Sequence, residues 1–145
     1  MALITFQDLP NTTTPLNASN LNNNFTECNN IVESGSNANG NYIKFSDGTM
    51  ICRTIVSLGQ QTFTAYGSSA PALYVVSGGS NYTWTFPQEF YDTNVTVSAI
   101  LASSGYTNTS MGWANNTKCI IYFSSNYSFT SYLTLHITAI GRWRA

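Results

Sequence analysis

An alternation of apolar and polar residues near the end of the chain constrains the fold most. Leu133, Leu135 and Ile137 would lie on one face of an extended strand. Tyr132, His136 and the neighbouring threonines would lie on the opposite face. Because side chains of a strand alternate between its two faces, this segment is expected to be a half-buried β-strand.

Turn signals divide the chain after Tyr42 into short apolar segments. Asp47-Gly48 is a strong hairpin signal, Gly78-Gly79 marks another turn, and Pro87 ends the segment before it. We expect strands at 42–45, 50–58, 72–76, 81–86, 94–103, 111–115, 118–125 and 132–143. Many short strands between turns are typical of sandwiches and barrels, so we predict an all-β fold, an antiparallel β-sandwich.

Charged residues are scarce, at 8% of the chain against about 25% in a typical soluble domain. Intrinsic disorder does not explain this, because aromatic residues make up 14% and the formal net charge is only -1. No apolar run approaches the roughly 20 residues of a transmembrane helix, so we expect no membrane insertion. Nucleic acid is not an expected partner, because binding to phosphates relies on a basic surface.

The N-terminal part of the chain has a different pattern. Leu21, Phe25, Cys28 and Val32 follow one another at the alternating spacings of a coiled-coil seam, and Gly35 would end such a helix. A helix this short is marginal alone in water. It would therefore pack either on the same helix of partner chains or on its own β domain.

These patterns divide the chain into three parts. Residues 1–34 are an attachment segment with a short helix, residues 35–41 are a flexible linker, and residues 42–145 are the β domain. The first ten residues lack the basic start and apolar stretch of a signal peptide. Export by the usual secretory route is therefore not expected.

Few residues could carry catalysis. His136 is the only histidine and lies within a strand, and GxSxG and phosphate-binding glycine motifs are absent. His136 better fits a subunit interface, with a metal or anion site on a threefold axis as the alternative. Glu89 and Asp92 share a loop and could act as a glycosidase pair, although chance proximity explains them better. We predict no enzyme, no metal site and no cofactor.

The three cysteines are Cys28, Cys52 and Cys119. Their odd number and wide spacing favour neither a zinc site nor a disulfide framework. Cys52 and Cys119 lie within apolar strand patterns. All three are therefore expected to be buried thiols that pack as small apolar residues.

Loops that mix aromatic rings with Asn, Ser and Thr suggest a recognition surface. Sugar rings stack on aromatic side chains, and neighbouring amides and hydroxyls bond the sugar hydroxyls. The candidates for glycan binding are Tyr106, Asn108, Trp113 and Asn115, followed by Tyr82 and Trp84. The alternative for Trp84 and Trp113 is that both fill the core between the sheets.

Four segments resemble parts of bacteriophage tail-fibre and head-fibre proteins. Residues 6–22 resemble a segment near the start of such proteins, FQDLPNTTTPLNASNLN. Residues 39–52, 85–99 and 133–143 resemble the first hairpin, the middle and the last strand of their C-terminal domains. Each motif is short, but together they span nearly the whole chain in a consistent order.

The resemblance implies a homotrimeric β-sandwich at the distal end of a fibre, similar in fold to H-type lectins. It implies binding to a host receptor, often a surface carbohydrate, a place in the virion, release by host lysis, and no cofactor. The N-terminal segment would then contact other virion proteins. Fibres usually have a long shaft, whereas a short Asn-rich helix would be the whole appendage here, which suggests a stub attached directly to the particle, a decoration fibre or an autonomous prophage-encoded protein. The alternative function is that of a purely structural fibre cap or capsid decoration protein without an external ligand.

Overall fold

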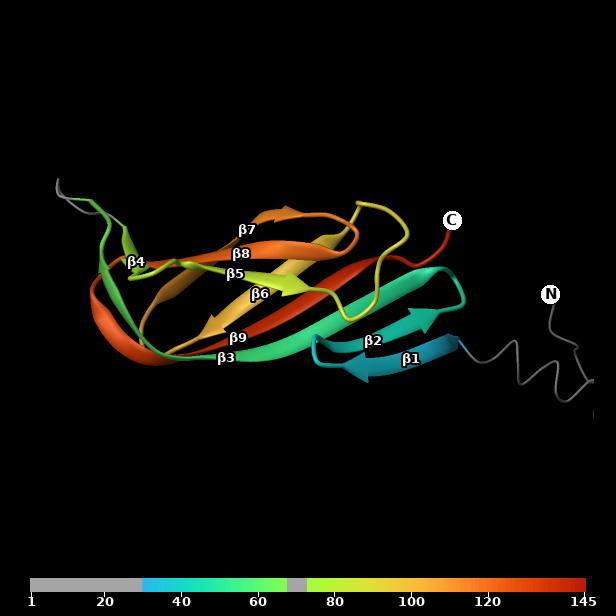
Figure 1. Ribbon diagram of the computed structural model, residues 1–145, viewed down its shortest axis with the longest axis horizontal. Coiled ribbons are helices and arrows are strands. Elements are labelled where there is room, and N and C mark those ends of the chain that lie inside the picture. The colour runs from blue at the N-terminus through green and yellow to red at the C-terminus, as the bar shows by residue number, and fades with distance from the viewer. Residues whose placement is uncertain (1–29, 68–72) are drawn as a thin grey trace, which may run out of the picture.

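The computed structural model describes residues 30–67 and 73–145, which form a curled antiparallel sheet (Figure 1). Its nine strands are β1 (Ile31–Asn37), β2 (Gly40–Phe45), β3 (Thr49–Ala65), β4 (Tyr74–Val76), β5 (Asn81–Thr85), β6 (Thr96–Ala102), β7 (Thr107–Ala114), β8 (Lys118–Ser125) and β9 (Phe129–Arg142). Every pairing is antiparallel. The prediction of an antiparallel all-β fold is confirmed.

The sheet folds into two layers. Strands β1-β2-β3-β9-β6 form one layer and β5-β8-β7 the other (Figure 1). β4 joins the layers at one end, because it pairs with β3 and also, through Tyr74 and Ser125, with β8. β6 and β7 close one side, where the Thr109 hydroxyl donates to the Ala99 carbonyl oxygen at 2.7 Å.

The core fills the space between the two layers. Its buried apolar residues are Met50, Cys52, Phe63, Val76, Trp84, Phe86, Phe90, Val95, Leu101, Cys119, Ile121, Phe123, Leu133, Leu135, Ile137 and Ala139. Leu133, Leu135 and Ile137 lie on one face of β9, as their period-two spacing predicted. Burial of such side chains stabilises the fold by roughly 1.5–3 kcal/mol each.

A β-bulge in β3 keeps its two halves directed at the same core. The pairing with β9 passes from Ser57↔Thr134 to Gly59↔Leu133, so that Leu58 is an extra residue. Gly59 has a φ of 70°, a conformation that glycine adopts without strain. The extra residue shifts the alternation of inward and outward side chains by one position, so that Phe63 faces the core. β3 continues to Ala65 rather than ending near residue 58 as expected.

β1 and β2 pair as a β-hairpin. Residues 31–34 are therefore strand and not the end of the predicted helix, and residues 35–41 are part of the hairpin and not a flexible linker. Both predictions are wrong for these residues. The Asn37 amide donates to the Pro87 carbonyl oxygen at 2.8 Å, which holds the turn against the body. Gly40 has a φ of 130°, and a side chain there would collide with the Arg53 carbonyl. The composition suggested flexibility, but the pairing of β1 with β2, and of β2 with β3, orders this segment.

The β domain therefore begins at Ile31 rather than at Tyr42. Val32, predicted to end a helical seam, lies in β1 with 54% of its surface exposed. Leu21, Phe25, Cys28 and the rest of the predicted helix lie outside the described residues. Their role in a seam stays a prediction.

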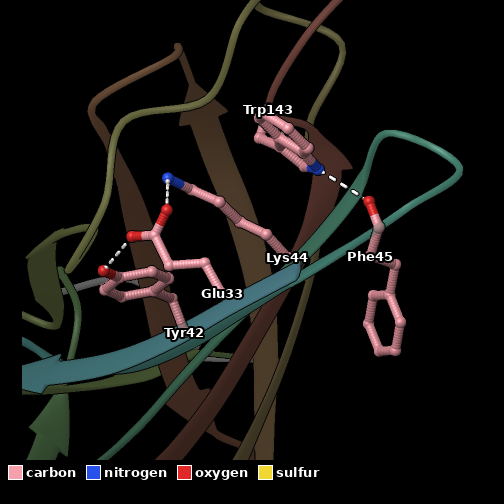
Figure 2. A network of polar contacts seen from close by, with 5 residues as sticks. All are labelled: Glu33, Tyr42, Lys44, Phe45 and Trp143. Carbon is pink, nitrogen blue, oxygen red and sulfur yellow. Dashed lines mark hydrogen bonds and ion pairs between the residues drawn. The ribbon is translucent and has the colours of Figure 1, made fainter. Parts of the chain in front are cut away.

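A polar cluster ties the hairpin to the end of the chain (Figure 2). Glu33 accepts hydrogen bonds from Tyr42 at 2.6 Å and from Lys44 at 2.8 Å, and the Trp143 indole donates to the Phe45 carbonyl oxygen at 2.9 Å. The bond from Lys44 holds the pKa of Glu33 below its usual value. The bond to Glu33 raises the pKa of Tyr42. At neutral pH Glu33 is therefore a carboxylate and Tyr42 is protonated, so that the Tyr42 hydroxyl can donate to Glu33.

An alanine inserted between Gln60 and Gln61 should destabilise the protein more than deletion of Leu58. The insertion would shift Phe63 by one position and turn it out of the core, whereas the deletion removes the bulge but leaves Gly59 opposite Leu133 and Phe63 opposite Phe129. We expect losses of at least about 4 kcal/mol and of about 1–2 kcal/mol, respectively. Urea unfolding at a fixed protein concentration measures both, and equal losses would contradict the register given to Phe63.

Candidate functional site

The predicted glycan-binding residues do not form one site. Tyr106 precedes β7, Asn108 lies at its start, Trp113 near its end and Asn115 beyond it. Tyr106 and Trp113 are seven positions apart, which corresponds to about 23 Å along an extended strand. The two aromatic residues thus lie toward opposite ends of the molecule.

Trp84 and Tyr82 of β5 face the interior. Trp84 is 1% exposed, and its indole nitrogen donates to the Asn39 carbonyl oxygen at 2.7 Å. Its ring meets that of Phe86 edge to face at 5.0 Å. Tyr82 is half-buried against the same core. Trp84 fills the core and offers no surface to a ligand, so its assignment as a glycan-binding residue is wrong.

Trp113 lies on the outer face of the β5-β8-β7 layer, 42% exposed. The Lys118 ammonium lies 5.8 Å from the centre of its ring. Asn115 supports the turn before β8, because its side-chain oxygen accepts hydrogen bonds from the backbone of Thr117 and Lys118, both at 2.9 Å. Trp113 is thus accessible, whereas the Asn115 oxygen is occupied by the turn.

β3 ends and β9 begins at the end of the molecule opposite the C-terminus (Figure 1). A row of aromatic rings lies there. We call this end the tip and the opposite end the base. Tyr106 is 81% exposed and contacts the Tyr127 ring edge to face at 6.4 Å. Tyr127 lies 5.2 Å from Phe129, which stacks on the buried Phe63 at 4.8 Å. The row runs from solvent into the core.

The outer face of the β3-β9-β6 layer is unusually apolar. Ile55 of β3 and Ile100 of β6 both pair with His136 of β9, so the three side chains lie side by side. Ile55 is 55% and Ile100 68% exposed, and Ile140 farther along β9 is 44% exposed. We call these residues, with His136, the isoleucine face. An outer sheet face in water is normally polar.

Both carboxylates of the suggested glycosidase pair have hydrogen-bonding partners within the described chain. Glu89 accepts a hydrogen bond from the amide of Asn116, in the turn between β7 and β8, at 2.5 Å. Asp92 accepts one from the backbone of Asn94, in its own loop, at 2.9 Å.

The described residues contain no helix that could cross a membrane. Within the same ranges, no three His, Cys, Asp or Glu side chains are grouped to hold a metal ion.

Sequence reasoning missed Tyr127, Phe129 and the isoleucines of the outer face. Tyr127 lies in the short Ser/Asn turn after β8 and Phe129 begins β9, an aromatic-rich stretch of sequence that could have marked them. Ile55 and Ile100 are far apart in the sequence and meet only through their pairing with β9.

No family model matches the chain, and no curated protein matches it. A solved N-truncated R1-type pyocin tail fibre has a similar fold, with a TM-score of 0.53 and 21% identity over 88% of this chain and 98% of that chain. A fragment of the P. aeruginosa R1 pyocin fibre, comprising its C-terminal residues 323-701, gives the same TM-score and identity. The chain spans 32% of that fragment. At this identity the likeness concerns the fold.

Cys52 and Cys119 are buried in the core and form no disulfide. Burial raises the pKa of each thiol to about 11. Cys28 lies outside the described residues. The prediction of buried thiols is confirmed for the other two.

The Cys28→Ser variant should resist alkylation in its folded state. Only the thiolate reacts, and at pH 8 both remaining thiols are protonated and enclosed. Iodoacetamide followed by mass spectrometry should find Cys52 and Cys119 unmodified in the native protein and both modified in urea. Because the folded pKa is the higher one, stability should fall as pH rises toward about 11. Alkylation of the native protein at the unfolded rate would contradict this burial.

Proposed function

We propose that the chain is a structural module of a phage-like fibre, that its copies associate through the isoleucine face, and that its β domain contacts a host-surface glycan. The fold likeness to R1 pyocin tail fibres supports a fibre module. The exposed isoleucines carry the proposal of self-association. We assign the module no enzymatic activity, and a place in a virion or phage-tail-like particle, from which host lysis would release it.

The isoleucine face has the composition of a contact between subunits. Three large aliphatic side chains from three adjacent strands are each 44–68% exposed. The ionisable side chains on this face of the described strands are Arg53, His136, Tyr132 and, at the base, Arg142, and no carboxylate accompanies them. A second copy is the favoured occupant because apolar surface needs no complementary charge, and the cores of subunit interfaces are depleted of charged residues.

Three copies are proposed, as the sequence resemblance implied. Their isoleucine faces would meet around a common axis, with His136 at the contact. Asn30 lies at the base, where its carbonyl oxygen accepts a hydrogen bond from the Ser46 N–H at 2.8 Å. The segment before it would extend the contact through Leu21, Phe25 and Cys28 or bind other virion proteins. Val32, on β1, would add to the contact only from the edge of the layer.

The double variant Ile55→Glu, Ile100→Glu should convert the assembly to a monomer. Two buried carboxylates per subunit would cost several kcal/mol at an interface, while neither substitution touches the core. Light scattering should give about three times the 15.9 kDa of the chain for the wild type and 15.9 kDa for the variant. Circular dichroism should show the same β-sheet content.

Thr83→Glu is the matched control, because Thr83 is exposed on the outer face of the other layer. It should leave the mass unchanged. A monomeric wild type at micromolar concentration, or a variant that keeps the wild-type mass, would refute association through this face.

A further inference from the structure

Charge is distributed unevenly between the two ends of the molecule. The charged residues of the described chain are Glu33, Lys44, Asp47, Arg53, Glu89, Asp92, Lys118, Arg142 and Arg144. They lie at the base or no farther along β3 than Arg53. Residues 54–67, 73–88, 93–117 and 119–141 contain no Asp, Glu, Lys or Arg. The described surface of the tip therefore consists of hydroxyl, amide, aromatic and backbone groups.

Tyr106 is exposed but its backbone is held on both sides. Its N–H donates to the Tyr127 hydroxyl at 3.2 Å, and its carbonyl oxygen accepts a hydrogen bond from the Ser125 hydroxyl at 2.9 Å. The Tyr127 N–H in turn donates to the Ser125 oxygen at 3.2 Å. Ser125 is 1% exposed. One buried hydroxyl thus fixes the two tyrosines relative to each other.

A second buried serine holds the same loop. Ser131, 8% exposed, accepts a hydrogen bond from the Ser104 N–H at 3.0 Å. The Ser103 hydroxyl donates to the Gly105 carbonyl oxygen at 2.7 Å. A side chain at Gly105 would press on the rings of Phe129 and Tyr127. Each residue of the loop before β7, residues 103–106, therefore takes part in a hydrogen bond or a packing contact.

Ser125 and Ser131 are the two buried polar residues of the described chain. Burying a hydroxyl costs free energy unless it forms hydrogen bonds. Ser125 forms these bonds with Tyr106 and Tyr127, and Ser131 accepts one from Ser104 of the loop that carries Tyr106 while it donates to the Tyr132 carbonyl oxygen of its own strand. The structure thus uses its buried polar groups to hold one exposed ring in place, and a ring held in advance loses little entropy on binding.

We infer that Tyr106 and Tyr127 form a stacking site for an uncharged sugar at the tip. The inference rests on the proposed function, which places glycan contact in the β domain, and adds the site and the chemical class. The exposed tyrosine ring offers an apolar face to the C–H groups of a sugar ring, and the surrounding serine and threonine groups suit its hydroxyls. An anionic sugar would find no Lys or Arg at the described tip.

The test is binding of the full chain to an array of immobilised glycans that includes neutral hexose oligomers, sialylated glycans and sulfated glycans. The wild type should bind neutral glycans, and Tyr106→Ala should lose at least about tenfold in affinity, as expected for a central aromatic contact. Tyr91→Ala is the matched control, because Tyr91 is 60% exposed at the base. It should bind like the wild type.

The Tyr127→Phe variant tests whether the Tyr127 hydroxyl holds Tyr106 in position. It keeps the ring but removes the hydroxyl that accepts from the Tyr106 N–H. A smaller loss than that of Tyr106→Ala is expected, mainly as faster dissociation, with thermal stability close to that of the wild type.

Each other outcome overturns the inference. These outcomes are no binding to any neutral glycan, binding confined to the anionic glycans, and equal binding by Tyr106→Ala and the wild type. Light scattering on the same samples keeps the two proposals apart. A multimer that binds no neutral glycan would leave the fibre module intact, whereas a monomer that binds through Tyr106 would refute self-association alone.

Discussion

The antiparallel pairing of β3 with β9 is the interaction on which the rest of the structure depends. It runs from Thr49↔Arg142 at the base to Phe63↔Phe129 at the tip. β2 and β4 are bonded to β3, and β6 to β9, so every strand is anchored to this ladder directly or through one or two neighbours. Because side chains of a strand alternate between faces, the same ladder supplies the core on one side and the isoleucine face on the other. A change of register would exchange the two.

The two ends of this ladder differ in their chemistry. At the base, ion pairs and cation–aromatic contacts, such as Lys44 with Glu33 and with Trp143, join the start of the described chain to its end. At the tip, neutral hydroxyl groups hold the aromatic rings in place. The proposed attachment lies at the base, and the proposed site for an uncharged sugar lies at the tip. The long strands between them keep the two proposed sites about 40–50 Å apart, given roughly 3.3 Å per residue over the 14 residues of β9.

The strand pattern after Tyr42 could be predicted because period-two alternation and turn residues are local properties. The β1-β2 hairpin was missed because its Ser, Asn and Gly residues have no apolar pattern, and contacts such as Asn37 with Pro87 order it. Trp84 was placed among the ligand candidates because a sequence does not state which face of a strand meets the core. Tyr106, another of the ligand candidates, is 81% exposed, and its role in glycan binding stays a prediction. Its partner Tyr127 lies 21 residues away and was not recognised.

The sequence by itself determined the class of the fold, the place of most strands and the uncharged character of the surface, since these follow from residue types and their spacing. The tertiary structure decided the rest. It placed Leu58 in a bulge, set Ile55 beside Ile100, and brought Ser125 under Tyr106. Each of these depends on the register between strands that are distant in the chain. Register is settled by the packing of the whole core, and no local pattern contains it.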